Sequence, residues 1–265
     1  MRRFVWMAAL LVLAASPAQA QESGCMARHL REAVRLNRER MPLYSELTGG
    51  RSRAISRRLI WAERFSMPVA WYVDWRARGF QRLGIPVVCA DFEPMDRTPA
   101  FRPRIEDPPP LSAFAPADAR RITRAVKRAY RAGGFAGAGA VLEGEIEALS
   151  RVPTFNCMTR HLLESALRIT NGARRYAAVA EARGVESPAG LSRALLTMHL
   201  TTLGEAARLD RRAAPLQAEG IPIICQDVPP IPPIPPDVPD VPDAPDAPDA
   251  PGAPDVPGAP FPPGD

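Results

Sequence analysis

The chain has 265 residues and a net charge of +5, and about half of its 31 prolines lie in residues 228–265. After the first 20 residues, no apolar run reaches the roughly 18 residues that a membrane-spanning helix needs, which excludes an integral membrane protein. Without the two ends, roughly 200 residues remain to form a core, enough for one domain or two small ones.

Residues 1–20 have the three parts of a cleavable secretory signal. Arg2 and Arg3 form a basic start, residues 5–15 are apolar, and Ala18-Gln19-Ala20 supplies small residues at the cleavage site. The sequence therefore predicts export to a periplasm or out of the cell, with Gln21 as the first mature residue. In an oxidising compartment, an even number of cysteines favours disulfides.

An internal duplication organises the rest of the chain. The sequence CMARHL at 25–30 recurs as CMTRHL at 157–162, and GIPVVCAD at 84–91 recurs as GIPIICQD at 220–227. Matches between these ends keep nearly the same register. Ser56 corresponds to Ser192, Asp74 to Asp210 and Gln81 to Gln217. Two copies of one unit are therefore predicted.

The two predicted units span residues 21–95 and 152–227. Each begins and ends with one cysteine, so the simplest pairing closes each unit on itself, as Cys25–Cys89 and Cys157–Cys225. In the chain-entropy model, a disulfide that closes a loop of about 65 residues stabilises the fold by about 4 kcal/mol.

Apolar residues within the units recur at three- and four-residue steps, which predicts helices. In the first unit, one helix ends at Gly49-Gly50 and a second fits residues 53–65. Ser66 is a candidate N-cap, with Pro68 just inside a third helix that ends near Leu83. The predicted fold class is all-α, with two duplicated, disulfide-clipped three-helix units.

The segments outside the units have distinct compositions. Residues 96–151 are predicted to form a proline-rich linker and a basic helical hairpin, with helices at about 117–132 and 138–150. Residues 228–265 form a Pro/Asp-rich tail in which every third residue from Pro230 to Pro263 is proline. This period is that of polyproline II, so the tail is predicted to be a disordered, extended spacer or docking stalk.

Charge separates the body from the tail. Because Arg2 and Arg3 lie in the signal and seven aspartates lie in the tail, the net charge of +5 corresponds to +10 for residues 21–227. Such a body attracts anionic partners. The expected partner is an anionic envelope component or a protein, bound through the basic body, the aromatic segment described below or the tail. Nucleic acid is not favoured.

The duplicated histidines suggest metal binding as one alternative. Cys25 and His29 stand four residues apart, as do Cys157 and His161, so two such pairs would form a Cys2His2 site. Disulfide formation uses the same cysteines and is favoured. We therefore predict no metal and no cofactor.

A His/Asp pair suggests an exported hydrolase of envelope material as a second alternative, with His29 or His161 acting with Asp74 or Asp210. No nucleophile elbow or other local catalytic pattern accompanies these residues. Their presence in both units favours an architectural role, so we assign no catalytic residue.

The tryptophans break the symmetry of the duplication. Trp61, Trp71 and Trp75 lie together in the first unit with Tyr72, whereas the corresponding positions of the second unit carry no aromatic residue. Two interpretations are open: the rings fill a core or the interface between units, or they form a binding surface.

The predicted function is that of an exported, non-enzymatic binding or scaffolding protein. The candidate binding residues are Trp61, Trp71, Tyr72, Trp75, Arg28, His29, Arg160 and His161.

Overall fold

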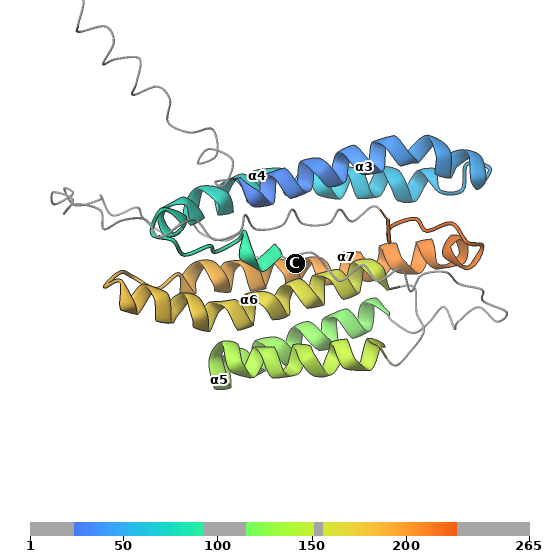
Figure 1. Ribbon diagram of the computed structural model, residues 1–265. Helices are drawn as coiled ribbons and strands as arrows, with labels where there is room; N and C mark the ends of the chain where they lie inside the picture. The colour runs from blue at the N-terminus through green and yellow to red at the C-terminus, as the bar shows by residue number, and fades with distance from the viewer. Residues whose placement is uncertain (1–23, 93–114, 151–155, 227–265) are drawn as a thin grey trace, which may run out of the picture. The chain divides into compact units, whose positions relative to one another are not determined.

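The computed structural model describes residues 24–92, 115–150 and 156–226, and in this part of the chain the protein is all-α (Figure 1). Five α-helices and one short 3-10 helix follow in order: α3 (Cys25–Leu47), α4 (Arg53–Arg82), η1 (Ala90–Phe92), α5 (Pro116–Ser150), α6 (Cys157–Ala182) and α7 (Ala189–Ala218). The predicted signal, the proline-rich part of the linker and the tail lie outside the described residues.

The first unit is a hairpin of two long helices, α3 and α4, so the prediction of three helices is wrong. Ser66 and Pro68 lie inside α4, and the Ser66 hydroxyl donates to the Ala62 carbonyl at 2.9 Å instead of capping a new helix. Pro68 removes one backbone hydrogen bond. The helix continues because its buried stripe extends on both sides of the proline, from Leu59 to Ala70.

The second unit repeats the two-helix arrangement with α6 and α7, which pack along each other. Both units end their second helix in the same way. Gly84 and Gly220 have positive φ angles of 69° and 85°, which a residue with a Cβ rarely adopts. The next N–H, of Ile85 or Ile221, donates back to Phe80 or Leu216, which is the Schellman arrangement.

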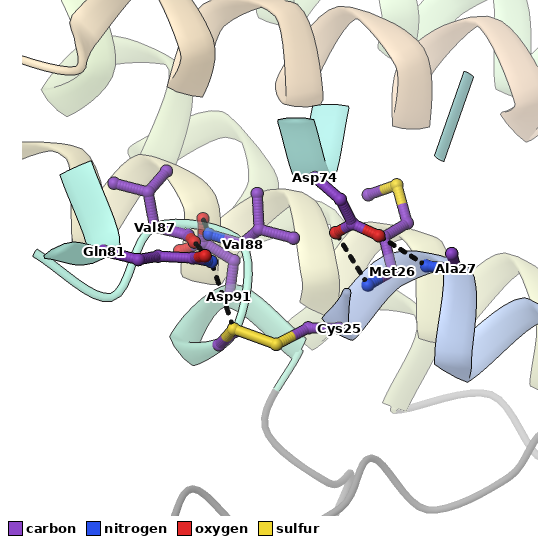
Figure 2. Close-up of a disulfide and its surroundings, with 9 residues drawn as sticks. Cys25, Met26, Ala27, Asp74, Gln81, Val87, Val88 and Asp91 are labelled. Carbon is purple, nitrogen blue, oxygen red and sulfur yellow. Dashed lines mark hydrogen bonds between the residues drawn. A yellow bond between two sulfur atoms is a disulfide. The ribbon is translucent and has the colours of Figure 1, made fainter. Parts of the chain in front are cut away.

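After this glycine, each unit has a short segment that we call the clip. The clip of the first unit is residues 85–91, and that of the second is residues 221–226. The disulfides Cys25–Cys89, shown in Figure 2, and Cys157–Cys225 join each clip to the start of its own unit, which confirms the predicted pairing. Gln81 donates to the Val87 carbonyl at 3.1 Å, and Gln217 donates to the Ile223 carbonyl. The clips are thus held by a side chain as well as by a disulfide.

The core is shared between the units. Ile85, Val87 and Val88 of the first clip belong to the buried cluster that also contains Leu163 and Ile169 of α6. In return, the second clip is buried with Tyr44, Ile55 and Leu59 of the first unit. Each clip is therefore buried with residues of both units, and the two units share core contacts.

Helix α5 covers the second unit, packing against both α6 and α7. It is a hairpin, because Gly133 and Gly134 leave helical geometry and separate two arms. Ile122 and Val126 of the basic arm are fully buried, and its arginines are exposed, as the amphipathic pattern predicts. None of the helices in the described part of the chain combines the length and apolarity needed to cross a bilayer.

Candidate binding surface

The largest exposed apolar side chains of the described residues gather on α4. Trp61, Phe65, Trp71, Tyr72 and Trp75 are 60, 70, 56, 56 and 61% exposed, and we call them the aromatic face. At 100° per residue, all five point within about 80° of the direction of Trp61. The stripe from Trp61 to Trp75 is about 21 Å long, since an α-helix rises 1.5 Å per residue.

The inner side of α4 carries much smaller residues. The buried positions of this helix are Ile55, Ser56, Leu59, Ala70, Val73, Asp74 and Ala77. They pack toward α3 and α7, the described elements with the main contacts to α4. The interpretation that the tryptophans fill a core or the interface between units is therefore wrong, because residues smaller than tryptophan pack against the neighbouring helices and the rings stay outside.

The second unit shows that the fold does not require aromatic residues at these places. Positions corresponding to Trp61, Phe65, Tyr72 and Trp75 in the register of the repeated sequence are also exposed in α7, and they carry Thr197, Thr201, Arg208 and Arg211. Trp71 is different, since its counterpart Ala207 is buried. The fold thus accepts solvated polar residues at these four positions. Aromatic residues occupy them in α4 and not in α7.

Every exposed charged residue of α4 is an arginine: Arg53, Arg57, Arg58, Arg64, Arg76, Arg78 and Arg82. The acidic residues of this helix point elsewhere, since Asp74 is buried and Glu63 accepts hydrogen bonds from Asn37. Arg57, Arg64 and Arg76 lie on the same side of the helix as the aromatic face. The surface is therefore apolar and cationic at once.

Contacts within α4 order the aromatic side chains. Trp61 stacks on Phe65 with ring centroids 5.1 Å apart, and Tyr72 contacts Trp75 at 6.1 Å. The Arg76 guanidinium lies 6.0 Å from the Tyr72 ring centroid and donates to its hydroxyl. These are neighbours three or four residues apart on a helix. The face is thus partly pre-organised for contact with a partner.

A pocket of about 290 Å³ lies at the start of α4, lined by Met41, Pro42, Ser45, Arg53 and Arg57. Arg57 precedes Trp61 by one helical turn, so the pocket adjoins the aromatic face. Its two guanidinium groups suit an anionic group, because arginine donates several hydrogen bonds in a fixed planar geometry.

Asp74 and Asp210 cap helices. Neither α3 nor α6 has a side-chain cap of its own at its N-terminus. Instead, Asp74 of α4 accepts the backbone N–H groups of Met26 and Ala27, at 3.1 and 2.9 Å (Figure 2). Asp210 of α7 accepts those of Met158 and Thr159, at 3.1 and 2.8 Å. Each cap ties the two helices of its unit together.

Burial acts strongly on these two carboxyl groups. Desolvation raises the pKa of Asp74, and it raises the pKa of Asp210 to about 7 despite the backbone hydrogen bonds. Both carboxylates are closed off from solvent, with 3% and 1% of the residue exposed. This position and bonding fit helix capping better than the predicted alternative of acid–base catalysis on an exported polymer.

The remaining candidate residues lie near the starts of α3 and α6. The His29 and His161 rings are buried and stack with centroids 6.0 Å apart, so the two units meet there through equivalent side chains. Both cysteines of the Cys2His2 alternative are held in disulfides and offer no thiolate ligand. Arg28 and Arg160 are exposed on the same two helices, and Arg160 pairs with Glu164 at 2.6 Å.

The arginines that flank the aromatic face are not among the candidate residues predicted from the sequence. The predicted boundary between Phe65 and Ser66 assigns Trp61 and Trp71 to different helices, which hides their common face. The signal is nevertheless present in the sequence as a second periodicity. Aromatic residues recur at helical spacing through Ser66 and Pro68, opposite in phase to the small apolar residues.

Comparison of the chain with known protein families, with characterised proteins and with solved structures finds no match to any of them.

Proposed function

We propose that the protein is an exported, non-enzymatic helical protein that binds a component of the cell envelope or the extracellular space through the aromatic face of α4. The observation that carries this proposal is the exposure of five aromatic side chains on one side of a helix whose inner side is small. Exposed aromatic clusters of this kind mark interaction sites, because leaving them in water is unfavourable.

The scaffold supports a binding role. The Cys25–Cys89 disulfide closes the unit that presents the face, and α4 packs against α3 and α7. A pre-ordered surface loses little conformational entropy when it binds, which favours affinity. Disulfides also suit an oxidising compartment and so support export.

The architecture of the chain is part of the same proposal. Two units that share caps, clips and disulfide positions are products of one duplication. The first unit carries the aromatic face, while α5 packs on the second. The Pro/Asp-rich tail, outside the described residues, serves as a spacer.

A co-sedimentation assay with total envelope material, membranes together with cell-wall polymer, tests this function. The variant that we call the aromatic swap gives α4 the residues of α7: Trp61→Thr, Phe65→Thr, Tyr72→Arg and Trp75→Arg. We expect the swap to weaken sedimentation by about tenfold or more, since hot-spot aromatic residues dominate interface energy.

A control on the other unit changes exposed arginines of α7, Arg211→Ala and Arg212→Ala, and is expected to lose much less sedimentation than the aromatic swap. Equal sedimentation of the wild type and the aromatic swap would contradict the proposal. Circular dichroism of all variants checks that the helices are intact.

A further inference from the structure

The aromatic face is the convex side of a single helix. Apart from the pocket at its start, its residues project outward from α4, whereas sites for small ligands are concave and enclose most of the ligand. An extended, nearly flat occupant therefore fits the face better than a small molecule.

The charge of the face decides between the extended occupants. All exposed charged residues of α4 are arginines, so a second copy of this face would bring like charges together. An anionic surface is attracted instead, both by these arginines and by the +10 charge of residues 21–227. Charge complementarity thus selects an anionic partner.

The combination of residues identifies the kind of anionic surface. Tryptophan and tyrosine concentrate at membrane–water interfaces, where an apolar ring body contacts acyl chains and a polar atom stays hydrated. Arginine beside them extends its apolar stem along the ring and leaves its charge at headgroup level. Helices that lie in the interface plane combine these two features.

We propose that the partner is the headgroup region of an anionic phospholipid bilayer, an inference that rests on the proposed function. Helix α4 lies along the membrane plane with Trp61, Phe65, Tyr72 and Trp75 inserted at the interface. Arg57, Arg64 and Arg76 contact lipid phosphates, and the pocket formed with Arg53 takes one phosphate group. The attachment is peripheral, through one helical face.

The chain offers an internal probe for this proposal. Four tryptophans are present, and the one outside α4 is Trp6 in the predicted signal. In the chain that begins at Gln21 and includes all described residues, tryptophan emission thus reports on α4 alone. Ring insertion into a bilayer predicts a blue shift of this emission and quenching by lipids brominated on their acyl chains.

The test uses this chain with vesicles of mixed phosphatidylcholine and phosphatidylglycerol, and with vesicles of phosphatidylcholine alone. We expect sedimentation, blue shift and quenching with the anionic vesicles, and at least about tenfold weaker binding to the neutral ones. Added salt weakens binding because it screens the arginines.

The aromatic swap separates ring insertion from simple charge attraction. It adds two arginines, so purely electrostatic binding would become stronger. Insertion predicts a loss of about tenfold or more, with no blue shift of the remaining Trp71. Arg57→Ala with Arg64→Ala is expected to weaken binding more than the control pair Arg211→Ala with Arg212→Ala, which removes the same charge from α7.

The outcomes distinguish the two proposals. If envelope material binds through the aromatic face but anionic vesicles do not, the bilayer inference is overturned and the binding function stands. If anionic vesicles bind the aromatic swap as tightly as the wild type, the proposal that the aromatic rings insert into the bilayer is overturned. If neither envelope material nor vesicles bind, both proposals fail.

Discussion

Residues at corresponding positions of the two units make the same local contacts. Asp74 and Asp210 cap α3 and α6 from neighbouring helices, and Gln81 and Gln217 hold the clips. Val88 and Ile224 have positive φ angles of 77° and 73°, which are costly for β-branched residues. Both side chains are fully buried, so the strain is tolerated where packing fixes the backbone.

Asp210 makes stability depend on pH in a direction opposite to that of most carboxylates. Its pKa is raised to about 7, so the native state binds a proton more readily than the unfolded chain does. Its contribution to stability is greatest below about pH 4 and is lost as the pH rises to about 7. We expect the free-energy advantage of the wild type over Asp210→Asn to shrink across this window, as urea denaturation at several pH values measures.

The surface ion pairs depend on pH in the opposite direction to Asp210. Hydrogen bonding to Arg58 lowers the pKa of Glu205, so this pair weakens as the pH falls. Comparing the two proteins at each pH cancels such contributions. A difference between wild type and Asp210→Asn that stays constant or grows with pH would contradict the burial argument.

The long helices tolerate residues that usually end a helix. Pro42, Pro68 and Pro215 lie within α3, α4 and α7, and Gly204 lies inside α7 at the place that corresponds to Pro68. Burial of one face of each helix offsets these local costs, because tertiary packing contributes more to helix stability than propensity does.

Two glycines in helices are expected to respond oppositely to alanine. A Cβ at Gly204 meets nothing within 4 Å, so Gly204→Ala should stabilise the protein by about 1 kcal/mol through helix propensity. A Cβ at Gly172 would lie 2.9 Å from Asp91 Oδ1 and from Tyr176 Cε2. Gly172→Ala should therefore destabilise by about 1–3 kcal/mol, as chemical denaturation of both variants measures.

The reason for the second effect is the contact between units. The Tyr176 hydroxyl donates to Asp91 of the first clip at 2.9 Å, and Gly172 leaves the room for it. If Gly172→Ala were as stable as the wild type, this close packing of α6 against the clip would be wrong.

In the whole molecule, the clips connect the cores of the two units. Surface pairs such as Arg51 with Glu219, at 2.6 Å, also join the units, but exposed ion pairs contribute little. The buried apolar clips stabilise the assembly more, since each fully buried aliphatic side chain contributes about 1.5–3 kcal/mol.

We expect residues 21–95, expressed alone with the disulfide formed, to lack a cooperative thermal transition. Ile85, Val87 and Val88 would lose the α6 residues that bury them. Calorimetry and near-ultraviolet circular dichroism measure this, with the full chain as control. A cooperative transition near that of the full chain would show that the first unit folds by itself.

Patterns along the chain were enough to predict the helical class, both disulfide pairs and the exposed arginines of α5. These features depend on local periodicity and on cysteine spacing, which are visible in the sequence. The paired aspartates and glutamines are visible there too. Their partners are not, because their hydrogen bonds join segments that lie apart in the chain.

Three features became clear only from tertiary packing: α4 is a single helix, each clip is buried with residues of the other unit as well as its own, and the tryptophans face outward. The physical reason is common to all three. Apolar periodicity shows that a helix has a face to bury, but not what buries it. On α4 two faces compete, one aromatic and one of small residues, and close packing against α3 and α7 selects the small one.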